Sequence, residues 1–211
     1  MSDKKQFNKR IITTAIATRD TDGKKTLVKF PALDNQFGTL ILGKEFDGTL
    51  ALTKGDTVVV FGDLGYEEYE SKGEKRHNLV VFVDKTATPE AGKEPSCWVN
   101  LTLRTSKEGH YAFTAKGLPW IGTRAAMSQG KDRDGNWKPS FFVDVKYFAK
   151  EEVDSVAETL TPKGVRFDAQ GFLEVEEYDG SDGKKHSKIV LSVRKVEVRP
   201  AAEPELEGEP A

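Results

Sequence analysis

The chain of 211 residues is poor in cysteine and has no long apolar run, and each scarcity excludes a class of protein. Cys97 is the only cysteine, which rules out an intramolecular disulfide and a cysteine-based metal cluster. No apolar run approaches the roughly 18 residues that span a bilayer, so we expect no membrane partner. The first ten residues lack the apolar core of a secretory signal. These absences favour a cytoplasmic protein.

Motifs for catalysis and for metal binding are also missing. None of the three histidines has a histidine four residues away or a nearby cysteine pair, as zinc sites require. No G-x-S-x-G, H-E-x-x-H or Cys–His arrangement indicates a nucleophile or a metal-activated water. We therefore expect neither enzymatic activity nor a cofactor.

The chain also has no excess of positive charge: its formal net charge is −2. Four glutamates lie in the last eleven residues, and without them the charge is +2. Residues 1–95 carry 15 basic and 15 acidic side chains, and residues 96–200 carry 17 and 15. Any affinity for nucleic acid must therefore come from segregated charge and from stacking rather than from bulk basicity.

What the chain does contain is an internal repeat. Residues 52–83 match residues 160–193 with an offset that grows from 108 to 110, and the matched pairs include Gly62 with Gly171 and Tyr69 with Tyr178. A period of this length is too long for a solenoid unit and indicates two copies of one small domain. The shared pattern is two strands joined by a glycine-containing turn.

Composition along the chain predicts the domain boundaries. We expect an N-terminal domain over residues 1–88, a Pro- and Gly-containing linker over 89–96 and a second domain over 97–199. Residues 200–211 form an acidic tail without core-forming residues, which we expect to be disordered.

Alternating patterns and turn signals predict a mainly β chain. Strands are expected at residues 11–19, 26–32, 39–43, 57–70 and 77–85, and then at 98–103, 119–127, 141–148, 164–178 and 186–198. One short helix is expected at residues 149–160, and Trp98 is expected in the core. Three strands, a helix and a two-stranded hairpin are the element order of the OB-fold, so we predict two tandem OB-fold barrels. The first has room for a shortened helix at most.

The strand FFVDVKYF carries the functional signal. Alternation places Val143, Val145 and Tyr147 on one face. Phe142, Asp144, Lys146 and Phe148 then share the other face, a mixture that is unusual for a core. Tyr178 and Tyr69 lie on polar faces of the repeated hairpins. Aromatic residues on a polar face are typical stacking platforms for single-stranded nucleic acid, although they also cover barrel edges and subunit interfaces.

Further candidates lie in turns rich in basic residues. Trp137 and Trp120 are additional stacking candidates. The cations that we expect near the phosphate backbone are Lys131, Arg133, Lys138, Lys146, Lys72, Lys75, Arg76, Lys184 and Lys185. A charged turn that is merely solvated, with its tryptophan folded back on its own strand, explains the same pattern.

Residues 98–196 resemble the bacterial and phage single-stranded DNA-binding protein (SSB) family. The resemblance rests on WVNLTL, GLPWIGTRAA, DGNWKPSFFVDVKYFAK, GFLEVEEYDG and HSKIVLSVRKVEV. It implies that Phe142 and Phe148 occupy the aromatic positions of the family's third strand, and Tyr178 that of its fourth. Residues 52–83 resemble the last two strands of the same domain, with Tyr69 at the corresponding position.

The resemblance implies a tandem SSB that forms a homo-oligomer, with a dimer favoured. It implies binding to single-stranded DNA without sequence preference, association with the nucleoid and possible contacts with replication and repair proteins. The process would be DNA replication, recombination or repair. The acidic tail lacks the hydrophobic tip with which family members recruit partners. Two alternatives stay open: an OB-fold protein-interaction subunit of a replication or repair assembly, and an RNA-binding OB protein.

Overall fold

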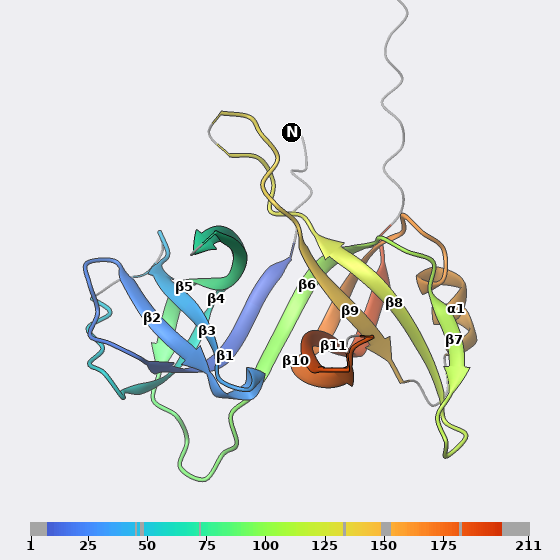
Figure 1. Cartoon of the computed structure of the whole chain (residues 1–211), viewed down its shortest axis with the longest axis horizontal. Helices are drawn as coiled ribbons and strands as arrows, with labels where there is room; N and C mark the ends of the chain where they lie inside the picture. Colours follow the sequence, from blue (N-terminus) through green and yellow to red (C-terminus); the bar gives the residue numbers. More distant parts are fainter. Residues whose placement is uncertain are drawn as a thin grey trace, which may run out of the picture.

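The computed structural model describes residues 8–44, 46, 49–71, 73–132, 134–148, 153–181 and 183–199. The predicted disordered tail, residues 200–211, lies outside them. The strands are β1 Lys9–Ala17, β2 Lys25–Phe30, β3 Gln36–Leu42, β4 Thr57–Ser71, β5 Glu74–Ala87, β6 Cys97–Thr105, β7 His110–Phe113, β8 Pro119–Met127, β9 Phe141–Tyr147, β10 Arg166–Asp179 and β11 Lys185–Val198 (Figure 1). The prediction of a mainly β chain is confirmed.

Strand pairing closes two rings that we call the first half (β1–β5) and the second half (β6–β11). In the first half the order is β1-β2-β3-β5-β4, and β4 pairs back with β1. In the second half the order is β6-β8-β9-β11-β10, and β10 pairs back with β6. Both rings contain one parallel pair, β3 with β5 and β9 with β11, so the internal repeat extends to the topology.

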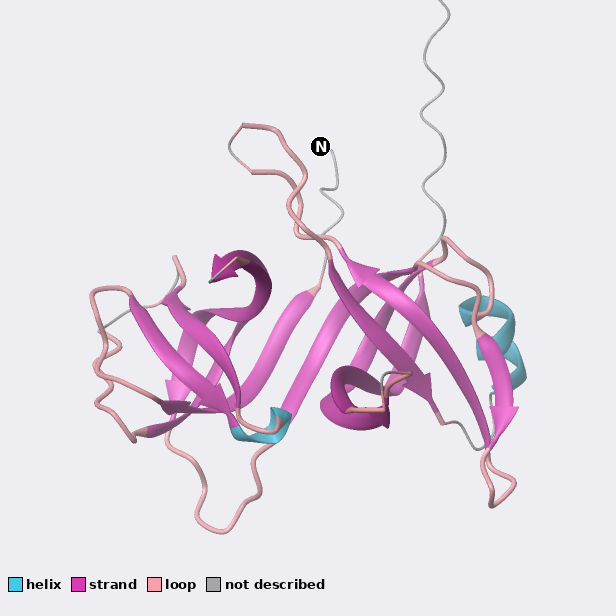
Figure 2. Cartoon of the chain, in the orientation of Figure 1, coloured by secondary structure: helices cyan, strands magenta, loops and turns pink. Residues whose placement is uncertain are grey.

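The two halves are joined edge to edge. β1 pairs antiparallel with β6, with Ile11 opposite Val99 and Ile12 opposite Trp98. This pairing makes all eleven strands one continuous sheet and places the two rings side by side (Figure 2). A strand pairing saturates backbone hydrogen bonds that would otherwise be exposed at an edge.

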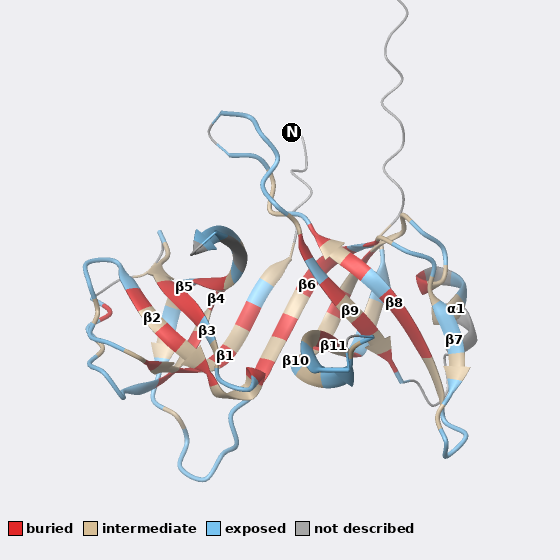
Figure 3. Ribbon diagram, in the orientation of Figure 1, coloured by how far each residue is buried: buried red, intermediate tan, exposed pale blue. Residues whose placement is uncertain are grey.

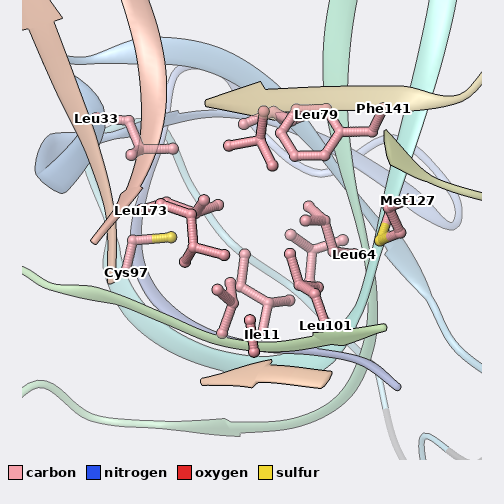
Figure 4. Packing of buried hydrophobic residues seen from close by; sticks show 14 of the residues in the cluster. Ile11, Leu33, Leu64, Leu79, Cys97, Leu101, Met127, Phe141 and Leu173 are labelled. Atoms are coloured by element: carbon pink, nitrogen blue, oxygen red, sulfur yellow. The ribbon is translucent and has the colours of Figure 1, made fainter. Parts of the chain in front are cut away.

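One cluster of buried hydrophobic residues runs through both halves. Figure 3 shows the regular alternation of buried and exposed positions along the strands that produces it. Leu64 and Leu79 of the first half and Met127 and Phe141 of the second belong to the same cluster (Figure 4). Cys97 is part of it, and burial raises the pKa of its thiol to about 12.

The glycines conserved between the repeats mark matching β-bulges. The register between β4 and β5 shifts at Gly62, and that between β10 and β11 shifts at Gly171. A Cβ on Gly62 would lie 2.1 Å from the carbonyl oxygen of Phe82, and one on Gly171 would lie 2.2 Å from that of Ser192. The facing strand therefore approaches too closely for any side chain at either position.

The predicted helix is present over its described part: α1 spans Val153–Leu160, and the first four residues of the predicted range lie outside the described residues. Two elements and one residue differ from the expectation. β7 and the short 3₁₀ helix η1, Pro31–Leu33, were not predicted. Trp98 is not in the core, because β6 turns Cys97, Val99 and its other inward positions to the interior and leaves Trp98 half-buried on the outer face.

Candidate nucleic-acid interface

The outer surface of β8 and β9 is a polar and aromatic face, as the alternation predicts. Val143 and Val145 are buried, whereas Phe142 is 49% exposed and Asp144 and Lys146 are partly exposed. Register places Arg124 of β8 opposite Asp144. The neighbouring strand β11 lies parallel to β9 on its other side.

Carboxylates lie beside three cations on this face and bind two of them, Lys146 and Lys188, through hydrogen bonds. Lys188 of β11 donates a hydrogen bond of 2.6 Å to Asp144, which also lies 4.0 Å from a guanidinium nitrogen of Arg124. Lys146 contacts Glu176 of β10 at 2.6 Å. Charge-assisted hydrogen bonds of this kind fix the direction of long side chains that would otherwise be mobile.

Each of these cations also lies against an aromatic ring. The distances to the ring centroids are 5.7 Å for Arg124 and Phe142, 5.8 Å for Lys188 and Tyr178, and 5.7 Å for Lys146 and Trp120. Phe148, 46% exposed, stacks on Trp120 with centroids 6.1 Å apart. Exposed aromatic rings and positively charged side chains therefore alternate across this face. We call it the β9 face, made by Trp120, Arg124, Phe142, Asp144, Lys146, Phe148, Glu176, Tyr178 and Lys188.

A hollow of about 420 Å³ lies in the β9 face over Gly122. The rings of His110 and Trp120 meet edge to face there, with centroids 4.7 Å apart. A Cβ on Gly122 would lie 2.5 Å from the His110 ring, so the glycine makes room for both rings. The hollow is thus walled by rings and lined by Arg124, Lys146 and Lys188.

The end of the β10–β11 hairpin extends the β9 face. Tyr178 is 47% exposed and stacks on His186 with centroids 5.6 Å apart. Lys184 and Lys185 are exposed in the same hairpin, and Lys185 lies 3.5 Å from Glu177. The structure therefore brings these predicted cations to the edge of the face.

Residues 128–140 form a long arm between β8 and β9 that projects beyond both halves (Figure 1). Asp132 accepts backbone hydrogen bonds from Asp134 and Asn136, which orders its tip. Trp137 is 71% exposed, with the ammonium of Lys131 5.2 Å from its ring centroid. The tryptophan therefore remains open to solvent. Lys138 is exposed, and the predicted Arg133 lies outside the described residues.

The first half contributes fewer of the predicted residues. Tyr69 is 48% exposed on the β4–β5 hairpin, where it pairs in register with Arg76. Lys72 and the side chains of Lys75 and Arg76 lie outside what the structure describes. Tyr69 belongs to the ring that does not carry the β9 face.

Several residues of the candidate interface escaped the sequence analysis. Arg124, His110 and His186 were missed because their partners lie on neighbouring strands. Lys188 was expected only as one of the basic residues of the hairpin that includes Lys184 and Lys185. Phe37 was missed as well: it is 63% exposed on β3, with Lys29 5.2 Å from its ring centroid. Phe37 occupies the position in the first half that Phe142 occupies in the second. Val80 faces Thr39 in the first half, and its repeat partner Val190 faces Asp144 in the second. Phe37 and Phe142 each lie two residues before these positions.

Two other kinds of site, a metal centre and a membrane-spanning helix, were sought among the described residues. Within them, no three His, Cys, Asp or Glu side chains are grouped so as to hold a metal ion. No helix in that part of the chain has the length and apolar character needed to cross a membrane.

Comparison with known proteins identifies the fold. No family model and no curated sequence matches the chain. The crystal structure of wild-type single-stranded DNA binding protein from Thermus aquaticus matches with a TM-score of 0.54 at 18% identity, covering 96% of this chain and 98% of that one. A deletion mutant of the same protein matches with a TM-score of 0.57 at 17% identity, covering 96% and 99%. The chain therefore shares its fold with that protein over nearly its whole length.

Proposed function

We propose that this chain binds single-stranded DNA without sequence preference and protects exposed strands during replication, recombination or repair. The observation that carries the proposal is the β9 face, on which open aromatic rings alternate with fixed cations. The shared fold with a protein named for binding single-stranded DNA supports it. No catalytic step is required, because binding alone protects the strand.

Stacking accounts for affinity without sequence preference. Every base has a π face, and a base stacked on an aromatic side chain contributes about 1–3 kcal/mol. Phe142, Tyr178 and the Phe148–Trp120 pair offer such surfaces on one face. Trp137 on the arm extends the same surface chemistry, and Tyr69 offers it on the first half.

Phosphates are bound by the cations between the rings. Lys146 and Lys188 are held beside carboxylates in the free protein, so they are already directed toward the surface before DNA arrives. Lys131 and Lys138 on the arm, with Lys184 and Lys185 on the hairpin, provide contacts at the margins. Arg133, Lys72, Lys75 and Arg76 belong to the same proposal on sequence grounds. Displacement of condensed counterions makes binding salt-dependent.

The two rings are proposed to be tandem OB-type domains, over residues 1–88 and 97–199, with residues 89–96 as the linker. The parallel pair and the closing pair of each ring match the order expected of that fold.

We also propose that the chain forms a homodimer. A row of apolar side chains crosses the outer face of β4, β1, β6 and β10 at facing positions, namely Phe61, Ile12, Trp98 and Phe172.

Fluorescence titration tests the proposed function. Trp137 is exposed and Trp120 lies in the β9 face, so dT oligomers are expected to quench emission, with an affinity that falls as salt rises. Phe142→Ala is expected to weaken binding by about 1–3 kcal/mol. Phe113→Ala is the matched control: Phe113 is 63% exposed, but it alternates away from His110 on β7. Absence of quenching and of any gel shift at low salt would refute the proposal.

The same titration separates the two alternatives. A strand of rU that binds as tightly as dT would favour the RNA-binding function. An unchanged affinity of Phe142→Ala for both strands would favour a protein-interaction subunit, in which the exposed rings are interface anchors.

A further inference from the structure

A groove lies where the arm meets the first half, away from the β9 face. It has a volume of about 420 Å³, and its lining includes Lys9, Tyr66 and Phe82 of the first half with Gln129 and Lys138 of the second. A second hollow of about 600 Å³ shares Lys9, Asp63 and Phe82 with it and continues to Lys44 beyond β3. We call the two hollows together the junction groove.

Gln129 fixes the geometry of the junction groove. Its side-chain amide accepts a hydrogen bond of 2.7 Å from the N–H of Tyr66 and donates one of 2.6 Å to the carbonyl oxygen of the same residue. It also donates to the carbonyl oxygen of Pro139. The base of the arm is thus bound to β4 in the way that a neighbouring strand would be. Both walls of the groove are in place before any ligand arrives.

Phe82 is an open aromatic surface in this groove. It is 41% exposed although it lies within a strand whose neighbours Val81 and Val83 are fully buried. Its ring lies over Gly65, where an added Cβ would approach the ring to 2.8 Å. A glycine at that position lets the ring lie close to the sheet, and the exposed remainder of the ring is available for stacking.

Two cations from different halves meet in the groove. Lys9 comes from β1 and Lys138 from the arm, and no ion pair to either is found among the residues that the structure describes. Burial, together with repulsion from Lys138, lowers the pKa of Lys9, against the attraction of Asp63. Holding like charges together in a partly buried site is unfavourable unless an anion neutralises them.

The acidic residues of the groove are placed differently. Asp63 and Asp84 both bind Arg10, which offsets one of their two negative charges. Glu67 and Glu68 lie toward the hairpin end of β4. Glu67 is about 13 Å along the strand from Asp63. Near Phe82 the lining therefore has two cations, Lys9 and Lys138, and one neighbouring acidic residue, Asp63.

We propose that the junction groove is a second nucleic-acid site, in which one nucleotide of the bound strand stacks its base on Phe82 and places its phosphate between Lys9 and Lys138. The proposal rests on the proposed function, because it assigns a path to the same strand. Phe142 follows Pro139 by three residues, so a strand leaving the Phe142 end of the β9 face meets the base of the arm, which lines this groove.

Two dT oligomers test the path, one of about 8 nucleotides, which suits a single OB-type face, and one about four times longer. Phe82→Leu keeps the apolar contact over Gly65 but removes the π face. It is expected to weaken binding of the long oligomer by about 5- to 150-fold and to leave the short one unchanged. The double variant Lys9→Gln/Lys138→Gln removes the contacts to one phosphate and is expected to make the salt slope for the long oligomer shallower by about 0.7.

Controls distinguish the possible outcomes. Lys116→Gln removes an exposed charge on the β7–β8 turn and is expected to leave the salt slope unchanged. If the wild-type chain binds neither oligomer, the proposed function itself fails. If it binds both and Phe142→Ala weakens both, while the groove variants match the wild type, only the groove proposal is overturned. Light scattering must show the wild-type oligomeric state for each groove variant; a changed state would reassign Phe82 to a subunit interface.

Discussion

At the scale of single residues, the β9 face is a set of cations that already have partners. Glu176 holds Lys146 at 2.6 Å, so a phosphate must compete with a carboxylate for the same ammonium. We therefore expect Glu176→Gln to increase affinity for dT oligomers by about two- to fivefold at low salt, the range of a partly exposed ion pair. Fluorescence titration measures it. Glu94→Gln removes one charge from the exposed linker and controls for net charge; equal gains in both variants would contradict a local competition.

The same residues show what sequence can and cannot reveal. Alternation along β9 correctly predicted which side of the strand Phe142 and Lys146 occupy, because strand periodicity is local. The ion pair between Lys188 and Asp144 joins residues 44 positions apart and depends on the parallel register of β9 and β11. No pattern in one sequence specifies that register.

At the scale of elements, the repeated β-bulges explain why two glycines match between the copies. At Gly171 the carbonyl oxygen of Ser192 occupies the space that a Cβ would need. Gly171→Ala must therefore separate β10 from β11 or distort the bulge, and we expect it to lower the free energy of unfolding by about 2–4 kcal/mol. Urea denaturation measures the change.

A glycine at an open turn provides the control for that substitution. Gly135 has a φ of +85° and no atom within 4 Å of an added Cβ, so only its backbone conformation favours glycine. Gly135→Asn is expected to cost less than about 1 kcal/mol, since asparagine tolerates this region. A comparable loss in both variants would show that close packing at the bulge is not the cause.

The arm is the other element with a specific anchor. In Gln129→Ala the N–H and the carbonyl of Tyr66 both lose a partner, and two partly buried hydrogen bonds contribute about 1–3 kcal/mol together. We expect hydrogen exchange at the Tyr66 amide to accelerate by about 5- to 150-fold, while Val99 in the core of the sheet keeps its protection. Unchanged exchange at Tyr66 would mean that the arm is held elsewhere.

Elements differed in how well the sequence predicted them. β8 was predicted with both ends correct, because Pro119 and the alternating apolar residues define it locally. β7 was missed because its four residues are mostly exposed and show no apolar alternation; it exists because it pairs with β8. Trp98 was wrongly assigned to the core for a related reason. Aromatic character alone does not distinguish the inner from the outer face of β6.

At the scale of the whole molecule, the joint between the halves creates a surface that neither ring has alone. The pairing of β1 with β6 aligns Ile12 with Trp98, and the flanking strands add Phe61 and Phe172 to one row. Lys85 lies over the Phe61 ring at 5.8 Å and Arg194 over the Phe172 ring at 5.9 Å. In a symmetric dimer the same patch of both chains forms the interface, and this row offers such a patch with apolar side chains from both halves.

Trp98 is at the centre of that row, so its substitution tests the proposed homodimer. A carboxylate introduced by Trp98→Asp would have to be desolvated in the interface, and we expect light scattering to give the mass of one chain instead of two. Trp98→Phe keeps the apolar contact and is expected to remain dimeric. The short dT oligomer should still bind Trp98→Asp, because the β9 face lies on other strands of the ring. A dimer that survives Trp98→Asp would exclude this row as the interface, whereas loss of short-oligomer binding would show that the β9 face depends on the dimer.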